Sequence, residues 1–156
     1  HGNEPSHHTT YMYAYSGEHY KIADKVRYIN NELYTDQPDG LSGNEDCGQM
    51  SAWYILSSMG FYPVNPSNGA YVFGSPLFDE VVLDIPGQKQ FKISAKNNSD
   101  KNIYIQSVSL NGEDHKYSYI THKEILKGGE LEFTMGPKPN KDFGKEKKYR
   151  PESIVY

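Results

Sequence analysis

The sequence has one cysteine in 156 residues, Cys47, so an intrachain disulfide framework is excluded. It has no apolar run that approaches the roughly 18 residues of a membrane span, and no secretory signal. Positive charge is also scarce, with 16 Lys and Arg against 20 Asp and Glu and a formal net charge of −4. A nucleic-acid partner requires a basic field, so we expect none. The chain begins at His1, inside what resembles a motif, so we expect it to be cut from a longer parent protein. The absence of a signal here therefore says nothing about whether that parent has one.

Hydrophobic residues are also fewer than in a typical globular protein, at 36% against about 45–50%. Aromatic residues are plentiful by contrast, with 14 Tyr, 6 Phe and 1 Trp. A core can therefore form, but many of its apolar side chains carry a polar tip. Tyrosine-rich surfaces occur in carbohydrate sites and in subunit interfaces, so this composition alone selects neither.

Residues 1–62 are expected to be helical. Two stretches space their apolar residues as helices do, His7, Tyr11, Ala14 and Tyr15 in the first, and Ile22, Val26, Ile29 and Leu33 in the second. A third helix follows the turn-rich loop 36–44, with Asp46 and Gln49 as a capping pair, and ends at Gly60. Apolar residues surround this third helix, which predicts that it is buried.

Residues 63–136 change to a period of two, which predicts strands. Val81, Leu83 and Ile85 recur at every second position, and a later run ends at Asn111-Gly112, a strong hairpin signal. Helices followed by strands indicate the α+β class, here with an antiparallel β meander. The lysine-rich segment 137–156 is expected to be a mobile or peripheral basic tail.

Three carboxylates could carry chemistry: Glu4, Glu45 and Asp46. Paired carboxylates perform glycoside hydrolysis, in which one acid protonates the leaving oxygen and the other activates water or attacks. A structural interpretation competes, because Asp46 suits an N-cap and Glu45 complements a helix dipole. The two roles are compatible, since a carboxylate that accepts backbone N–H bonds stays ionised, as a general base must.

The first residues offer a possible metal site. His7 and His8 are adjacent and project about 100° apart, so a zinc site is not expected. Asn3 and Glu4 offer oxygen ligands, which suit calcium. The alternative is that Asn3-Glu4-Pro5 only starts a helix.

Three motifs occur in order along the chain: Gly-Asn-Glu-Pro-Ser-His-His at 2–8, Gly-Asn-Glu-Asp-Cys-Gly-Gln-Met-Ser-Ala-Trp-Tyr at 43–54, and Met-Gly-Phe-Tyr-Pro-Val at 59–64. Together they resemble glycoside hydrolase family 92, which comprises calcium-dependent, inverting exo-α-mannosidases, many of them α-1,2-mannosidases. The later Gly-Ser-Pro-Leu-Phe at 74–78 also fits, and the resemblance extends to about residue 135. It implies a C-terminal portion, namely the last helices of an (α/α)6 barrel and the strands after them.

The resemblance also implies roles for individual residues. Asp46 corresponds to the general base, with Glu45 beside it as a second catalytic candidate. Asn44 stands where the family often has an assisting carboxylate, and we assign it and His7 to substrate binding. Asn3 and Glu4 become candidate calcium ligands. The general acid lies upstream of this chain.

The implied function is removal of terminal α-linked mannose from glycans by an inverting enzyme. Its expected partners are mannose-containing glycans and the upstream β-sandwich and barrel portion of the parent chain. The parent is expected to be periplasmic, cell-surface or secreted, and the fragment alone inactive. The alternative is a stand-alone carbohydrate-binding or structural module in which Asp46 is only a cap.

Overall fold

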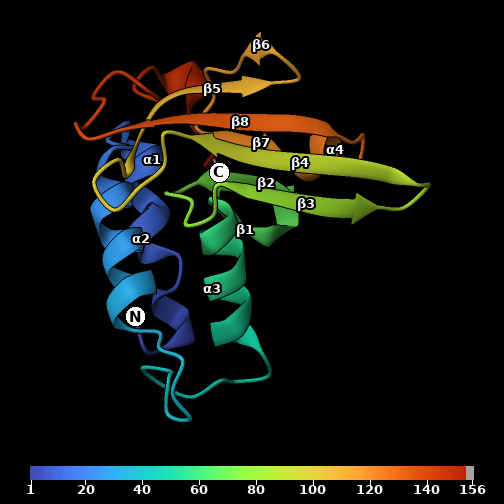
Figure 1. Cartoon of the computed structure of the whole chain (residues 1–156). Coiled ribbons are helices and arrows are strands. Elements are labelled where there is room, and N and C mark those ends of the chain that lie inside the picture. Colours follow the sequence, from blue (N-terminus) through green and yellow to red (C-terminus); the bar gives the residue numbers. More distant parts are fainter. Residues whose placement is uncertain (154–156) are drawn as a thin grey trace.

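A computed structural model describes residues 1–153 and shows a helical part beneath a strand-rich part (Figure 1). The helical part comprises η1 (Glu4–Ser6), η2 (Thr9–Met12), α1 (Tyr13–Ser16), α2 (Lys21–Glu32) and α3 (Gln49–Met59). The predicted helices at 22–33 and up to residue 59 are confirmed as α2 and α3. The first predicted helix is instead two 3₁₀ turns followed by one α turn.

The helical part packs around a core that also includes Tyr62 and Val72 of the strand-rich part. In α2 the expected apolar stripe is buried, and Gly60 ends α3 in a left-handed conformation with φ of 104°. The largest side chains of this core are aromatic, and its main members are Tyr11, Ala14, Ile22, Val26, Ile29, Tyr34, Met50 and Trp53. The apolar positions of the sequence therefore place α2 against α3.

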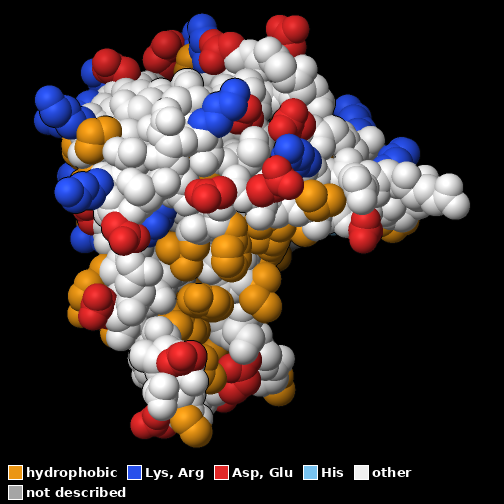
Figure 2. Space-filling model, viewed as in Figure 1, with side chains coloured by type: hydrophobic (Ala, Val, Ile, Leu, Met, Phe, Trp, Pro, Cys, Tyr) orange, Lys and Arg blue, Asp and Glu red, His pale blue; other side chains and the backbone are white. Residues whose placement is uncertain are grey.

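One face of α3 remains uncovered, so the predicted burial holds for only part of its surface. Met50 and Trp53 are fully buried, whereas Ile55 is 56% exposed. Figure 2 shows hydrophobic side chains gathered in the concave angle below the strand-rich part, over α3. Apolar residues around the whole helix thus form a core on one side and an exposed patch on the other.

The strands form two sheets. The smaller sheet is antiparallel, with β1 (Phe61–Asn65), β2 (Ala70–Phe73) and β7 (Tyr119–Thr121) in that order. The larger has the order β3 (Glu80–Ile85), β4 (Lys89–Lys96), β8 (Gly129–Gly136), β5 (Tyr104–Leu110), β6 (Glu113–Asp114). The short segments η3 (Pro66–Asn68), α4 (His122–Ile125) and η4 (Lys147–Tyr149) complete the fold.

The α+β class is confirmed, but the strands are not a simple antiparallel meander. β8 lies between β4 and β5, and it pairs with β4 in parallel, from Phe91 opposite Gly129 to Lys96 opposite Thr134. The inward side chains of β8 are Leu131, Phe133 and Met135, all at most 2% exposed. β8 thus takes the centre of the sheet, a choice of partner that alternation within one strand does not reveal.

The segment after β8 packs against the body instead of extending from it as a tail. Asn140 Nδ2 donates to the Gln106 carbonyl oxygen at 2.7 Å, and the Ser118 amide donates to the Tyr149 carbonyl oxygen at 2.9 Å. The lysines between these contacts are exposed. The segment thus presents basic side chains to solvent, while its other residues bind the body of the protein. Residues 154–156 of the expected tail lie outside the described residues.

One buried cation joins the two parts of the molecule. Arg27 of α2 donates from Nε to Ser75 Oγ at 2.9 Å and from Nη2 to the Pro76 carbonyl oxygen at 2.5 Å. Its Nη2 also donates to Asn98 Oδ1.

Within residues 1–153, no helix is long and apolar enough to cross a membrane.

Candidate functional site

Two glycines bring the first segment of the chain against the loop before α3. A Cβ atom on Gly2 would lie 2.2 Å from the Ser42 carbonyl oxygen, and one on Gly43 would lie 2.1 Å from the Gly2 carbonyl oxygen. Only residues without a side chain allow so close a backbone approach. As a result, the predicted metal segment and the predicted catalytic loop lie together.

This approach brings the carboxyl of Glu4 close enough to that of Asp46 to change its pKa. The hydrogen bond with Glu4 and the negative charge of Glu4 raise the pKa of Asp46, because each disfavours the ionised form of Asp46. Asp46 is exposed and Glu4 is partly buried. The structure therefore joins two of the predicted site residues into a carboxyl pair that solvent can reach.

The backbone around Asp46 rules out the predicted N-cap. Asp46, Cys47 and Gly48 all have positive φ, at 45°, 59° and 88°, and the N-cap position of α3 belongs to Gly48. Three left-handed residues in succession are costly for side chains other than glycine. The helix therefore starts two residues later than the predicted capping pair required. The Asp46 carboxyl does not cap it and is instead a neighbour of the Glu4 carboxyl.

Glu45, and not Asp46, makes the side-chain contact at the N-terminus of α3. Its Oε1 accepts a hydrogen bond from the Ser51 amide, in the first turn of α3, at 3.1 Å. A carboxylate at a helix N-terminus satisfies an otherwise unpaired amide and complements the dipole. The position of Glu45 thus favours a structural role over the catalytic role that the sequence suggested.

His7 is not placed to contact a sugar, contrary to the prediction from sequence. Its side chain is 2% exposed, and burial lowers its pKa. Its Nε2 lies 3.2 Å from Met50 Sδ, its Nδ1 lies 3.2 Å from Gln49 Nε2, and Trp53 Nε1 donates to its carbonyl oxygen at 3.0 Å. Both ring nitrogens therefore face protein atoms, and His7 acts as internal support for the site.

Two aromatic residues, to which the sequence analysis gave no role, pack beside the buried His7. His1 stacks on His7, with ring centroids 4.6 Å apart, and its Nε2 lies 2.8 Å from the Tyr34 hydroxyl. Tyr34 also donates to the Met50 carbonyl oxygen at 3.1 Å, and burial raises its pKa. Tyr34 directly follows the apolar stripe of α2, and that position was the signal available in the sequence.

The remaining predicted residues are exposed. Asn3 precedes η1 with an extended backbone, and Asn44 lies on the loop before Asp46. With Glu4 and Asp46, the Asn3 amide offers oxygen donors of the kind that calcium prefers, but calcium takes six to eight ligands. Among residues 1–153 there is no group of three or more His, Cys, Asp or Glu that could hold a metal ion. The donors thus fit calcium in chemistry but supply only part of a coordination shell.

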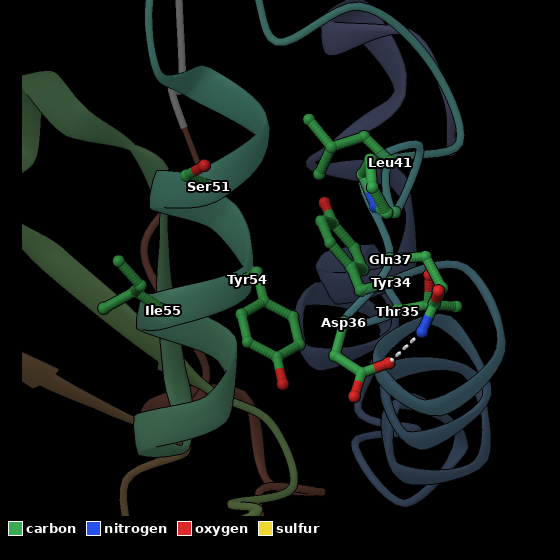
Figure 3. Close-up of a pocket in the computed structure, with 10 residues that line it drawn as sticks. Tyr34, Thr35, Asp36, Gln37, Leu41, Ser51, Tyr54 and Ile55 are labelled. Carbon is green, nitrogen blue, oxygen red and sulfur yellow. Dashed lines mark hydrogen bonds between the residues drawn. The ribbon is translucent and has the colours of Figure 1, made fainter.

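A hollow of about 570 Å³ lies between the loop after α2 and the side of α3 (Figure 3). Tyr54 comes from the helix and Asp36 from the loop, where Gln37 Nε2 donates to Asp36 Oδ1 at 2.9 Å. Its volume is within the range of small-molecule sites, about 300–1,000 Å³. Asp46 does not line it, but Ser51, whose amide is bound by Glu45, does. The hollow therefore does not include the carboxyl pair.

Comparison with known proteins gives consistent matches. Residues 1–137 match the glycosyl hydrolase family 92 catalytic domain. An uncharacterized secreted glycosidase of Arthroderma benhamiae is 33% identical over 138 residues, covering 86% of this chain and 18% of that protein.

Two solved structures from Bacteroides thetaiotaomicron are also similar. The family GH92 α-mannosidase BT3965, in complex with mannoimidazole, is 41% identical with a TM-score of 0.93, covering 98% of this chain and 20% of that one. The family GH92 inverting mannosidase BT2199 is 42% identical with a TM-score of 0.92, covering 98% of this chain and 21% of that one. The chain thus spans about a fifth of the length of these relatives.

Proposed function

Because the chain belongs to glycosyl hydrolase family 92, we propose that it is the part of an α-mannosidase catalytic domain that carries the general base. The two similar structures are of mannosidases, one of them inverting. The substrate class is terminal α-linked mannose on glycans, with α-1,2 linkages as the first to test. Asp46 is the base.

The observation that carries this proposal is the state of the Asp46 side chain. It is exposed, it does not cap α3, and its one described polar partner is another carboxyl group, that of Glu4. A side chain that serves only the fold would be expected to bind backbone amides, as Glu45 does. A general base must instead be accessible to water and able to take a proton.

Glu4 cannot be the general acid that works with Asp46. Inversion requires the two catalytic carboxyls to be roughly 6.5–9.5 Å apart, and even retention requires about 5–5.5 Å. Glu4 acts on the pKa of Asp46 as a direct neighbour, which is closer than either separation. We take the acid to lie upstream of this chain, as the family resemblance implies, and for this reason the 156 residues alone are expected to release no mannose.

The reaction is then a single displacement. Asp46 removes a proton from water, and the water oxygen bonds to the anomeric carbon of mannose. The glycosidic oxygen departs with a proton from the acid, and the configuration at the anomeric carbon inverts. Asn3 and Glu4 would supply oxygen ligands to calcium, which would hold mannose hydroxyls and help to distort the ring.

The upstream portion of the parent chain is its proposed structural partner. The match to a secreted glycosidase supports a protein that is exported, in the periplasm, at the cell surface or outside the cell.

The experiment is to treat α-1,2-, α-1,3- and α-1,6-mannobiose with the full-length protein, and to follow the first product by proton NMR. β-Mannose appearing before mutarotation is the expected result, with activity lost in a chelator and restored by calcium. Initial α-mannose would contradict the inverting mechanism, and no release from any of the three would contradict the proposed function.

A further inference from the structure

The turns that carry Glu4 and Asp46 differ in backbone handedness, but the same kind of backbone hydrogen bond closes both. His7 follows Glu4 by three residues, and the His7 amide donates to the Glu4 carbonyl oxygen at 3.0 Å. Gln49 follows Asp46 by three residues, and the Gln49 amide donates to the Asp46 carbonyl oxygen at 3.3 Å. Each carboxyl residue therefore starts a hydrogen-bonded turn that ends at a residue of the clamp described next.

The ends of these two turns are joined by the Gln49 carboxamide. Its Nε2 lies 3.2 Å from His7 Nδ1 and donates to the Tyr62 hydroxyl at 3.0 Å. Tyr62 belongs to β1, is 8% exposed, and stacks on Tyr11 with ring centroids 5.4 Å apart. The clamp of His7, Gln49 and Tyr62 thus connects the first segment, α3 and the smaller sheet.

The protons of this clamp are fixed by its chemistry. An amide nitrogen is only a donor, so His7 Nδ1 must accept, and the proton of a neutral ring then lies on Nε2, which faces Met50 Sδ at 3.2 Å. Gln49 therefore fixes the tautomer of His7 as well as the distance between His7 and α3. Hydrophobic packing alone would allow the two turns to slide, whereas these directed contacts do not.

We propose that Gln49 is a positioning residue that sets the separation of Glu4 and Asp46 by holding the turns that carry them. This inference rests on the proposed function, and it adds a residue that contacts neither carboxyl group. Misplacement of a reacting group by about 1 Å can cost about 100-fold in rate. Loss of the clamp should therefore lower kcat more than it raises KM.

The test compares three variants of the full-length protein. Gln49→Met keeps the volume and removes both donors, while Gln49→Glu can still accept from Tyr62 and from the other tautomer of His7. Gln106→Met is the matched control, because Gln106 in β5 also makes two amide hydrogen bonds, to the carbonyl oxygens of Tyr104 and Lys138. Each is assayed on α-mannosides below its melting temperature, and by hydrogen exchange over residues 2–8 and 44–51.

Gln49→Met is expected to lower kcat by about 10- to 100-fold and to speed exchange in both segments. Gln49→Glu should recover most of kcat, and Gln106→Met should change neither measurement. Equal kcat for Gln49→Met and Gln106→Met, or faster exchange in 44–51 alone, would overturn the inference. If the wild-type protein hydrolyses no mannoside, the proposed function fails separately, and hydrogen exchange alone decides whether the clamp exists.

Discussion

The carboxyl group of Glu4 raises the pKa of Asp46 as a direct neighbour, although the two residues come from different segments of the chain. Two carboxyls in contact repel when both are ionised, so the surrounding structure must hold them together. The backbone contact between Gly2 and Gly43 does this from one side, and the clamp at Gln49 from the other.

The first prediction concerns that backbone contact. Gly43→Ala places a methyl group against the Gly2 carbonyl oxygen, which cannot move away as a flexible side chain could. Overpacking of this kind costs about 1–3 kcal/mol, and here it should also separate the carboxyls and lower kcat. Melting temperature and mannoside turnover of the full-length protein measure the two effects. Ser42→Ala is the neighbouring control, and equal turnover in the two variants would contradict this account.

The second prediction uses the left-handed turn before α3. Cys47→Gly should stabilise the chain by up to about 1 kcal/mol, because the left-handed penalty of about 1–2 kcal/mol exceeds the added entropy of an unfolded glycine. Gly48→Ala at the next position, with φ of 88°, should destabilise by a similar amount. Urea denaturation of both variants gives the comparison. Two changes of the same sign would show that side-chain contacts, and not backbone strain, decide these positions.

The third prediction concerns acid stability and comes from His19. Its Nε2 donates to the Phe73 carbonyl oxygen at 2.9 Å, and burial lowers its pKa to about 4, against 6.5 for a free histidine. Between these values the unfolded chain binds more protons than the folded one, so stability is full above pH 6.5 and falls as pH drops toward 4. The expected loss between pH 7 and pH 5 is about 2 kcal/mol.

His19→Gln tests this, because the glutamine amide can still donate to Phe73 but does not titrate. Urea midpoints at pH 7 and pH 5 should differ less in this variant than in the wild type. Burial also lowers the pKa of His7, with the same sign, so part of the slope will remain. His8→Gln on the surface is the matched control. An unchanged slope in His19→Gln would contradict the assignment.

Local patterns predicted the elements better than their partners. Ile22, Val26 and Ile29 predicted α2 because a helix brings every third or fourth residue to one face. Nothing within β8 predicted its parallel pairing with β4, since Leu131 and Phe133 would alternate equally well beside any strand. The docking of the last segment depends on Asn140 and Tyr149, polar contacts that were hidden among exposed lysines.

The candidate site shows the same division. The motifs located Glu4 and Asp46, and the fold brings both together. The local geometry predicted from the sequence was wrong. Asp46 and Cys47 adopt a left-handed conformation, so α3 is preceded by Gly48 as its N-cap position. The side-chain contact at the helix N-terminus is therefore made by Glu45. The sequence analysis also placed His7 at the substrate, because burial of a histidine depends on what packs over it, here His1, Met50 and Trp53.

The most direct measurement is the turnover of an α-mannoside by the full-length protein carrying Asp46→Asn or Glu45→Gln. If Asp46 is the base, Asp46→Asn should lower kcat by at least about 100-fold while mannose still binds in a calorimetric titration. Glu45→Gln should keep kcat within a few fold and cost about 1 kcal/mol of stability through its weakened bond to the Ser51 amide. Wild-type turnover in Asp46→Asn would contradict the account, as would abolished turnover in a stably folded Glu45→Gln protein.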